Sequence, residues 1–131
     1  MTTAAHLHDL LPGLSDPLWL GVPLRVHVPQ RDPAELHVLR WSNHPAFEVG
    51  VERTVFQDVV IMCTTRERTL VDLVRYRRRL GGPAVAARCL RAYSAAGGRR
   101  ATVRSMADAT RMPHPARLVL ETLLDGMDAA S

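Results

Sequence analysis

The feature that most constrains this chain is a change of apolar period near its middle. Val59–Cys63 is an unbroken apolar run rich in β-branched side chains, which is typical of a strand buried on both faces. Further along, apolar residues recur at about 100° per residue and share one side of a helix: Leu70, Leu73, Val74 and Leu80. The sequence therefore predicts a core strand that leads directly into a core helix.

Two threonines lie at the junction between the predicted strand and helix. Thr64 or Thr65 can cap the helix, and Thr64 with Glu67 three residues later forms a capping box. A glycine pair that begins at Gly81, followed by a proline, ends the helix. These signals predict a helix over about Arg66–Leu80.

The chain divides into a strand-rich half and a helical half. We expect a single domain over 1–131, with a tail or short docking helix at 1–17, a strand-rich half at 18–63 and a helical half at 64–128. The fold class is α+β, with an antiparallel or mixed sheet of about four or five short strands packed against about four helices. Strands are predicted at 19–23, 24–28, 35–41, 47–55 and 59–63, and the later helices at 83–95, 102–111 and 115–127.

Composition places the chain among cytoplasmic globular domains. Its 131 residues suffice for one core. No apolar run approaches the roughly 20 residues of a membrane span, and the N-terminus lacks the pattern of a secretory signal. Cys63 and Cys89 both lie in apolar segments, so we expect buried, reduced thiols rather than a disulfide.

Candidate catalytic groups are sparse, and we expect no enzyme activity, no catalytic residue, no metal and no cofactor. The histidines lack zinc-ligand spacing, and His6 and His8 read as part of a mobile N-terminus. Asp58, Glu67 and Asp72 near the core strand keep a nuclease-like alternative open. The chain has no lysine to assist such a site, and Asp72 is expected to form a surface ion pair with neighbouring arginines.

Arginine supplies all seventeen cationic side chains, and the formal net charge is +4. Such a balance permits a polyanionic partner. We expect one basic helical face that contacts nucleic acid or a protein partner, formed by Arg75, Arg78, Arg79, Arg99 and Arg100. The alternative is a set of solvated helix ends, favoured by the helix dipole.

Arg77 is the unusual residue of the first helix, because it projects into the apolar sector. A buried arginine needs a carboxylate or carbonyl groups. The structural interpretation is an ion pair with Glu121 or Asp125, and the functional one is a contact to a partner or a phosphate.

The segment Thr65–Arg77 resembles a family motif, Ser-Pro-x-Arg/Lys-Thr-Val/Leu-x-Asp-x-Phe/Leu-Arg/Lys-Tyr/Phe-Arg. The motif belongs to the effector domain of the AbiEi family, antitoxin-type transcriptional regulators of bacterial type IV toxin–antitoxin systems. Trp19–Pro23, Leu39–Ser42 and Gly50–Glu52 are similar to other elements of that domain, while Arg66 replaces the usual proline. The resemblance implies structural roles for Thr65, Arg68, Thr69, Asp72, Tyr76 and Arg77.

The resemblance also implies a function. The chain would be a non-enzymatic effector domain of a DNA-binding regulator, functionally linked to a nucleotidyltransferase-like toxin without a stable complex, and able to form a homo-oligomer. The family's winged helix-turn-helix precedes this domain, whereas this chain begins just before the first strand. Two alternatives stay open: a degenerate nucleic-acid-processing domain, or the oligomerisation remnant of a DNA-binding regulator.

Overall fold

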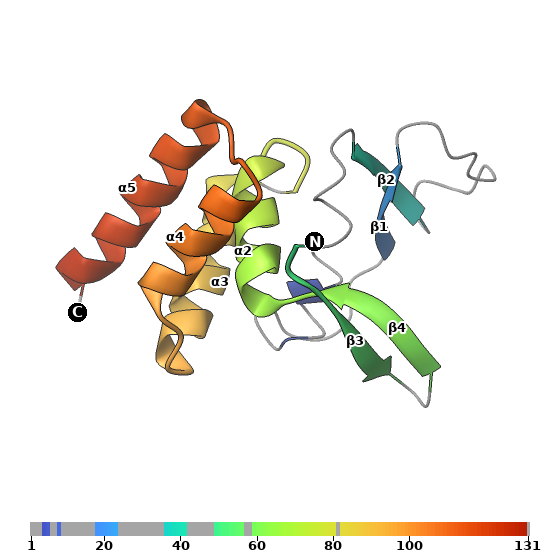
Figure 1. Ribbon diagram of the computed structural model, residues 1–131. Coiled ribbons are helices and arrows are strands. Elements are labelled where there is room, and N and C mark those ends of the chain that lie inside the picture. The colour runs from blue at the N-terminus through green and yellow to red at the C-terminus, as the bar shows by residue number, and fades with distance from the viewer. Residues whose placement is uncertain are drawn as a thin grey trace.

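A computed structural model describes residues 4–5, 8, 18–23, 36–41, 49–56, 59–80 and 82–130. Apart from the helical Ala4 and Ala5, strands precede helices along the described chain, which confirms the α+β class (Figure 1). The strands are β1 (Leu18–Pro23), β2 (Leu36–Trp41), β3 (Val51–Phe56) and β4 (Val59–Thr64), and the helices are α2 (Arg66–Arg75), α3 (Pro83–Ala95), α4 (Arg100–Ala109) and α5 (His114–Ala130). The strand expected at 24–28 lies outside the described residues.

The strands form two pairs. β3 and β4 make the expected antiparallel hairpin, in register from Val51 opposite Thr64 to Phe56 opposite Val59. β1 and β2 pair in parallel, which requires a long connection between them. Within the described residues these pairs are separate two-stranded sheets, so the expected sheet of about four or five strands is shown only in part.

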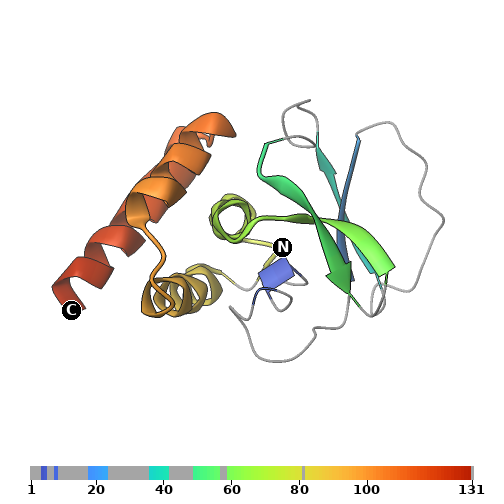
Figure 2. The same ribbon diagram turned by 60° about the horizontal axis from the view of Figure 1, so that its bottom comes forward.

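Helix α2 occupies the centre of the molecule. Figure 2 shows it nearly end-on, with the strands on one side and α4 and α5 on the other. It contacts α3, α4, α5 and β4. Every residue of α2 from Arg68 to Val74 is buried, so the helix faces protein on all sides rather than along one stripe.

The apolar core surrounds this helix. The expected apolar side of α2 is confirmed, because Leu70, Leu73 and Val74 are buried. The core also takes in Ala5 near the N-terminus. The other helices contribute Cys89, Leu90 and Tyr93 from α3, Val103 and Ala107 from α4, and Leu120 and Leu124 from α5.

Helix α2 is shorter than the sequence predicts, because it ends at Arg75 and residues 76–80 form turns. The backbone N–H of Arg79 donates to Tyr76 O at 2.9 Å, and that of Gly82 donates to Arg77 O at 2.7 Å. Three consecutive arginines offer no apolar group to bury, which explains why the helix does not continue along the core. By contrast, α3 has the predicted bounds.

Strand β4 differs from the expectation of burial on both faces. Met62 is 64% exposed, whereas Cys63 next to it is 6% exposed. Successive side chains of a strand point to opposite faces, so one face of β4 meets solvent at this point. An apolar run alone does not tell a strand buried on both faces from one with a partly exposed face.

The packing of α2 predicts a large cost for Leu73→Ala. Leu73 is 1% exposed, so the truncation leaves a cavity and should lower the free energy of unfolding by about 2–5 kcal/mol. The matched control is Met62→Ala, which removes a similar side chain at an exposed site and should change stability by less than about 1 kcal/mol. Urea unfolding followed by circular dichroism measures both, and equal midpoints for the two variants would contradict this packing.

Candidate functional site

A buried ion pair lies at the centre of the segment that carries the family resemblance. Arg68 and Asp72 have fully buried side chains, and Arg68 Nε donates to Asp72 Oδ2 at 3.0 Å and to Oδ1 at 3.1 Å. Arg68 Nη1 also donates to the carbonyl of Val49 at 2.7 Å. The predicted pairing of Asp72 with an arginine is confirmed, but its predicted surface position is wrong.

The electrostatics of Asp72 follow from this burial. Desolvation raises the pKa of the Asp72 carboxyl, although the charge and hydrogen bonds of Arg68 act in the opposite direction. The carboxylate therefore depends on its arginine partner to stay ionised in the core. The pair is part of the core, and the side chain of Asp72 is fully buried.

The threonines of the motif fix the start of α2. The hydroxyl of Thr65 accepts from the backbone N–H of Arg68 at 3.2 Å, which makes Thr65 the N-cap. Thr69 donates to the carbonyl of Thr65 at 2.7 Å, and its hydroxyl lies 2.8 Å from that of Thr64. The capping box predicted for Thr64 and Glu67 is therefore not formed, since the helix begins one residue later.

The turn before β3 packs closely on this polar centre. Gly50, predicted to lie within a strand, has φ +69° and precedes β3. Its carbonyl accepts from the backbone N–H of Thr65 at 2.8 Å. A Cβ at Gly50 would lie 2.7 Å from the Arg68 Cβ and 2.9 Å from the Met106 Sδ. Both the backbone conformation and the close approach require glycine here.

Tyr93 links the start of α2 to the turn between α3 and α4. Its hydroxyl donates to Glu67 Oε1 at 3.0 Å and accepts from the backbone N–H of Arg99 at 3.2 Å. The guanidinium of Arg66 lies 5.6 Å from the centroid of the ring. A Cβ at Gly98 would lie 2.3 Å from the ring, so this glycine serves the contact as well as the helix end.

His8 holds a contact that the sequence did not predict. Its Nε2 lies 2.6 Å from the carbonyl of Thr64 and 3.8 Å from the Sγ of Cys63. His8 thus lies against the end of β4, while the mobility expected for the N-terminal tail stays a prediction. The sequence offers a short docking helix at 1–17 as one alternative, but no pattern in it singles out His8 for this contact.

The five arginines expected to form one basic face lie at two separate ends of the helical layer. Arg75 donates to the carbonyl of Thr110 at the end of α4, while Arg78 and Arg79 are exposed just after α2. Arg99 and Arg100 stand at the start of α4, beside Tyr93 and the first turn of α2. Since α4 rises about 15 Å between its ends, the two groups do not make one surface.

The predicted partners of Arg77 are taken by other arginines. Arg77 Nη1 donates to the carbonyl of Val74 at 3.1 Å. Glu121 instead accepts from Arg104 Nε at 3.1 Å and from Arg117 Nε at 3.0 Å. Although burial acts to raise the pKa of Glu121, these hydrogen bonds hold it below its ordinary value. Asp125 lies 4.0 Å from Arg104.

The described residues hold no cluster of metal-ligating side chains. No three histidine, cysteine, aspartate or glutamate side chains of these residues gather closely enough to hold a metal ion. Of the acids considered for a nuclease-like site, Glu67 and Asp72 take part in separate contacts, and Asp58 lies outside the described residues. Both cysteines are free thiols, as predicted, and burial raises the pKa of Cys89 to about 11.

Comparison with models of protein families and with curated proteins finds no match to this sequence. Among the helices in the described part of the chain, none combines the length and apolar character needed to cross a bilayer.

The buried pair predicts that Asp72→Ala is far more costly than loss of the whole pair. Removal of the carboxylate takes the Asp72 partner away from the buried charge of Arg68, which should lower the free energy of unfolding by about 3–5 kcal/mol. The double variant Arg68→Met with Asp72→Leu removes both charges and should recover most of that loss. Chemical denaturation measures the free energy of unfolding of the unsubstituted chain, of Asp72→Ala and of the double variant. A double variant as unstable as Asp72→Ala would show that the pair itself, rather than its broken half, carries the stability.

Proposed function

We propose that this chain is an AbiEi-like effector domain of a bacterial antitoxin or transcriptional regulator, and that it acts without catalysis through a cationic surface. The observation that carries the proposal is the position of the exposed arginines just beyond the end of α2. The roles that the resemblance assigns to Thr65, Arg68, Thr69 and Asp72 agree with their burial and hydrogen bonding. The motif thus specifies the scaffold, and its surroundings supply the working surface.

The cationic surface consists of Arg77, Arg78, Arg79 and Arg111, and we call it the α2-end surface. Arg78, Arg79 and Arg111 are exposed, and Arg77 is partly exposed. Arg111 follows Thr110, whose carbonyl binds Arg75, so the ends of α2 and α4 meet here. Helix C-termini favour cations, yet four arginines are more than a helix end needs. Phosphate contacts require positive charge along a surface, which this end provides.

The finer expectations belong to the same proposal. The domain would work in the cytoplasm, would counteract a nucleotidyltransferase-like toxin without a stable complex, and could self-associate. The two strand pairs would belong to one mixed sheet of about four or five strands. The ion pair between Arg68 and Asp72 supports a non-enzymatic role, because it commits a motif carboxylate to packing.

The proposal predicts that Arg78→Glu with Arg79→Glu weakens binding to a labelled DNA duplex. Loss of two phosphate contacts should reduce the slope of log K against log salt concentration by about 2. Fluorescence anisotropy across a salt series measures the slope. The matched control is Arg66→Glu with Arg99→Glu, which makes the same change of net charge at the opposite end of α2. Equal effects of the two double variants would show that net charge, rather than the α2-end surface, governs binding to DNA.

The antitoxin part of the proposal predicts a rescue in cells. A nucleotidyltransferase-like toxin encoded beside this chain should arrest growth when expressed alone, and co-expression of the chain should restore growth. The two purified proteins should elute separately in size-exclusion chromatography, because no stable complex is expected. Arrest that persists despite folded, expressed chain would exclude the antitoxin role. A variant that reverses Arg78 and Arg79 tests whether rescue needs the α2-end surface.

A further inference from the structure

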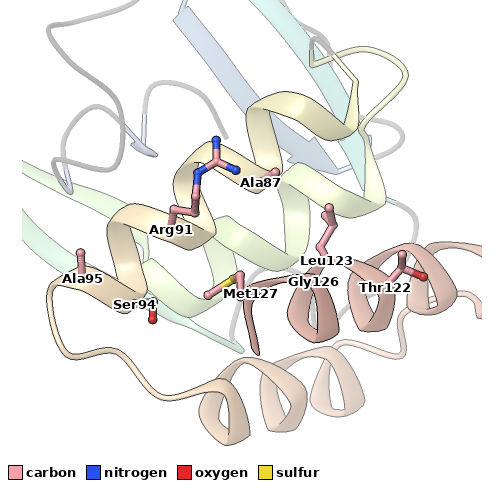
Figure 3. A pocket seen from close by; sticks show the side chains of 8 residues that line it. All are labelled: Ala87, Arg91, Ser94, Ala95, Thr122, Leu123, Gly126 and Met127. Carbon is pink, nitrogen blue, oxygen red and sulfur yellow. The ribbon is translucent and has the colours of Figure 1, made fainter. Parts of the chain in front are cut away.

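A groove between α3 and α5 lies away from the α2-end surface. It encloses about 520 Å³. Figure 3 shows Leu123 and Met127 projecting from α5 toward α3, with Arg91 rising from the α3 side. The remaining lining residues are small or short, namely Ala87, Ser94, Ala95, Thr122 and Gly126. None of the contacts described for α2, the strands or the α4–α5 ion pairs uses this groove.

The shape of the groove suits a third helix. The lining residues of α3 run from Ala87 to Ala95, about 12 Å of helix axis, which matches about two turns of an occupant helix. Small side chains on both walls let another backbone come close. A Cβ added to Gly126 would meet nothing within 4 Å, so the centre of the groove is open. Leu118 is 56% exposed one helical turn before Thr122 and extends the apolar surface along α5.

The two charged side chains of the α3 wall are both arginines. Arg91 lines the groove, and Arg88, which follows the lining residue Ala87 on the same helix, is exposed. Of the α5 acids whose side chains the structure describes, Glu121 binds Arg104 and Arg117, and Asp125 lies near Arg104. In the described residues neither Arg88 nor Arg91 has an ion pair. An occupant with carboxylates along one edge would therefore complement the α3 wall.

We infer that the α3–α5 groove is a docking site for an amphipathic helix of a partner protein, with an apolar stripe and acidic side chains on one edge. The apolar stripe lies against Leu123 and Met127, and the acidic edge faces Arg91 and Arg88. A second copy of this chain fits less well, because a closed dimer through the groove would bring the same arginines of both copies together. The inference is independent of the proposed contact with nucleic acid.

The test uses two synthetic helical peptides of about 15 residues with the same leucine stripe. One carries glutamate at the flanking positions and the other carries lysine. An NMR titration of the full ¹⁵N-labelled chain should show dose-dependent shifts at Ala87, Ala95 and Gly126 with the acidic peptide alone. Equal shifts with both peptides, no shifts with either, or shifts confined to the α2-end surface would overturn the inference.

Matched variants locate the binding. Both side chains introduced at Gly126 enter open space, so neither variant should disturb the fold. Gly126→Leu should fill the groove and abolish peptide binding, whereas Gly126→Ala adds one methyl group and should retain peptide binding. Arg91→Glu should raise the Kd for the acidic peptide at least about tenfold, and Arg78→Glu should leave it unchanged. Unaltered binding to Gly126→Leu would place the peptide elsewhere. A dimer of the chain in sedimentation equilibrium that Gly126→Leu disrupts would favour a second copy as the occupant and overturn the inference.

Discussion

The burial of two charges, Arg68 and Asp72, is the constraint that the surrounding fold has to satisfy. It lies inside a helix that is covered on every side, where neither charge can reach water. Each charge is tolerable only because the other is held within 3.0 Å. The pair also binds the carbonyl of Val49, which brings the turn before β3 against α2. Helix α2 and the turn before β3 thus meet at this buried pair of charges.

The same region explains why the strands and helices join where they do. Thr65 ends β4's extended backbone and caps α2, while its N–H bonds back to the carbonyl of Gly50. Thr69 and Thr64 share a hydroxyl contact within the first turn. These bonds satisfy polar groups that would otherwise be buried without partners. A polar seam through the core therefore specifies the geometry that apolar packing alone would leave loose.

The sequence predicts the elements of this fold better than it predicts their surroundings. The bounds of α3, the β3–β4 hairpin and the apolar side of α2 all follow from local periodicity. The burial of Asp72 cannot be predicted from periodicity, because the pattern of α2 is that of an amphipathic helix and does not reveal that neighbouring elements cover both of its faces. The early end of α2 and the contact of His8 with Thr64 also depend on tertiary structure. The sequence groups Arg75, Arg78, Arg79, Arg99 and Arg100 by charge. Their division between the two ends of the helical layer depends on how α2 and α4 pack together.

The distribution of charge depends on which carboxylates form ion pairs inside the fold. Asp72 pairs with Arg68 inside the core, and Glu121 forms ion pairs with Arg104 and Arg117 between α4 and α5. Asp108 also pairs with Arg117, so the seam between these helices is nearly neutral. Described arginines outside this seam include those just after α2 and those of α3. On the two proposals made above, the arginines beyond the end of α2 and those of α3 would be the places where this helical layer meets a partner.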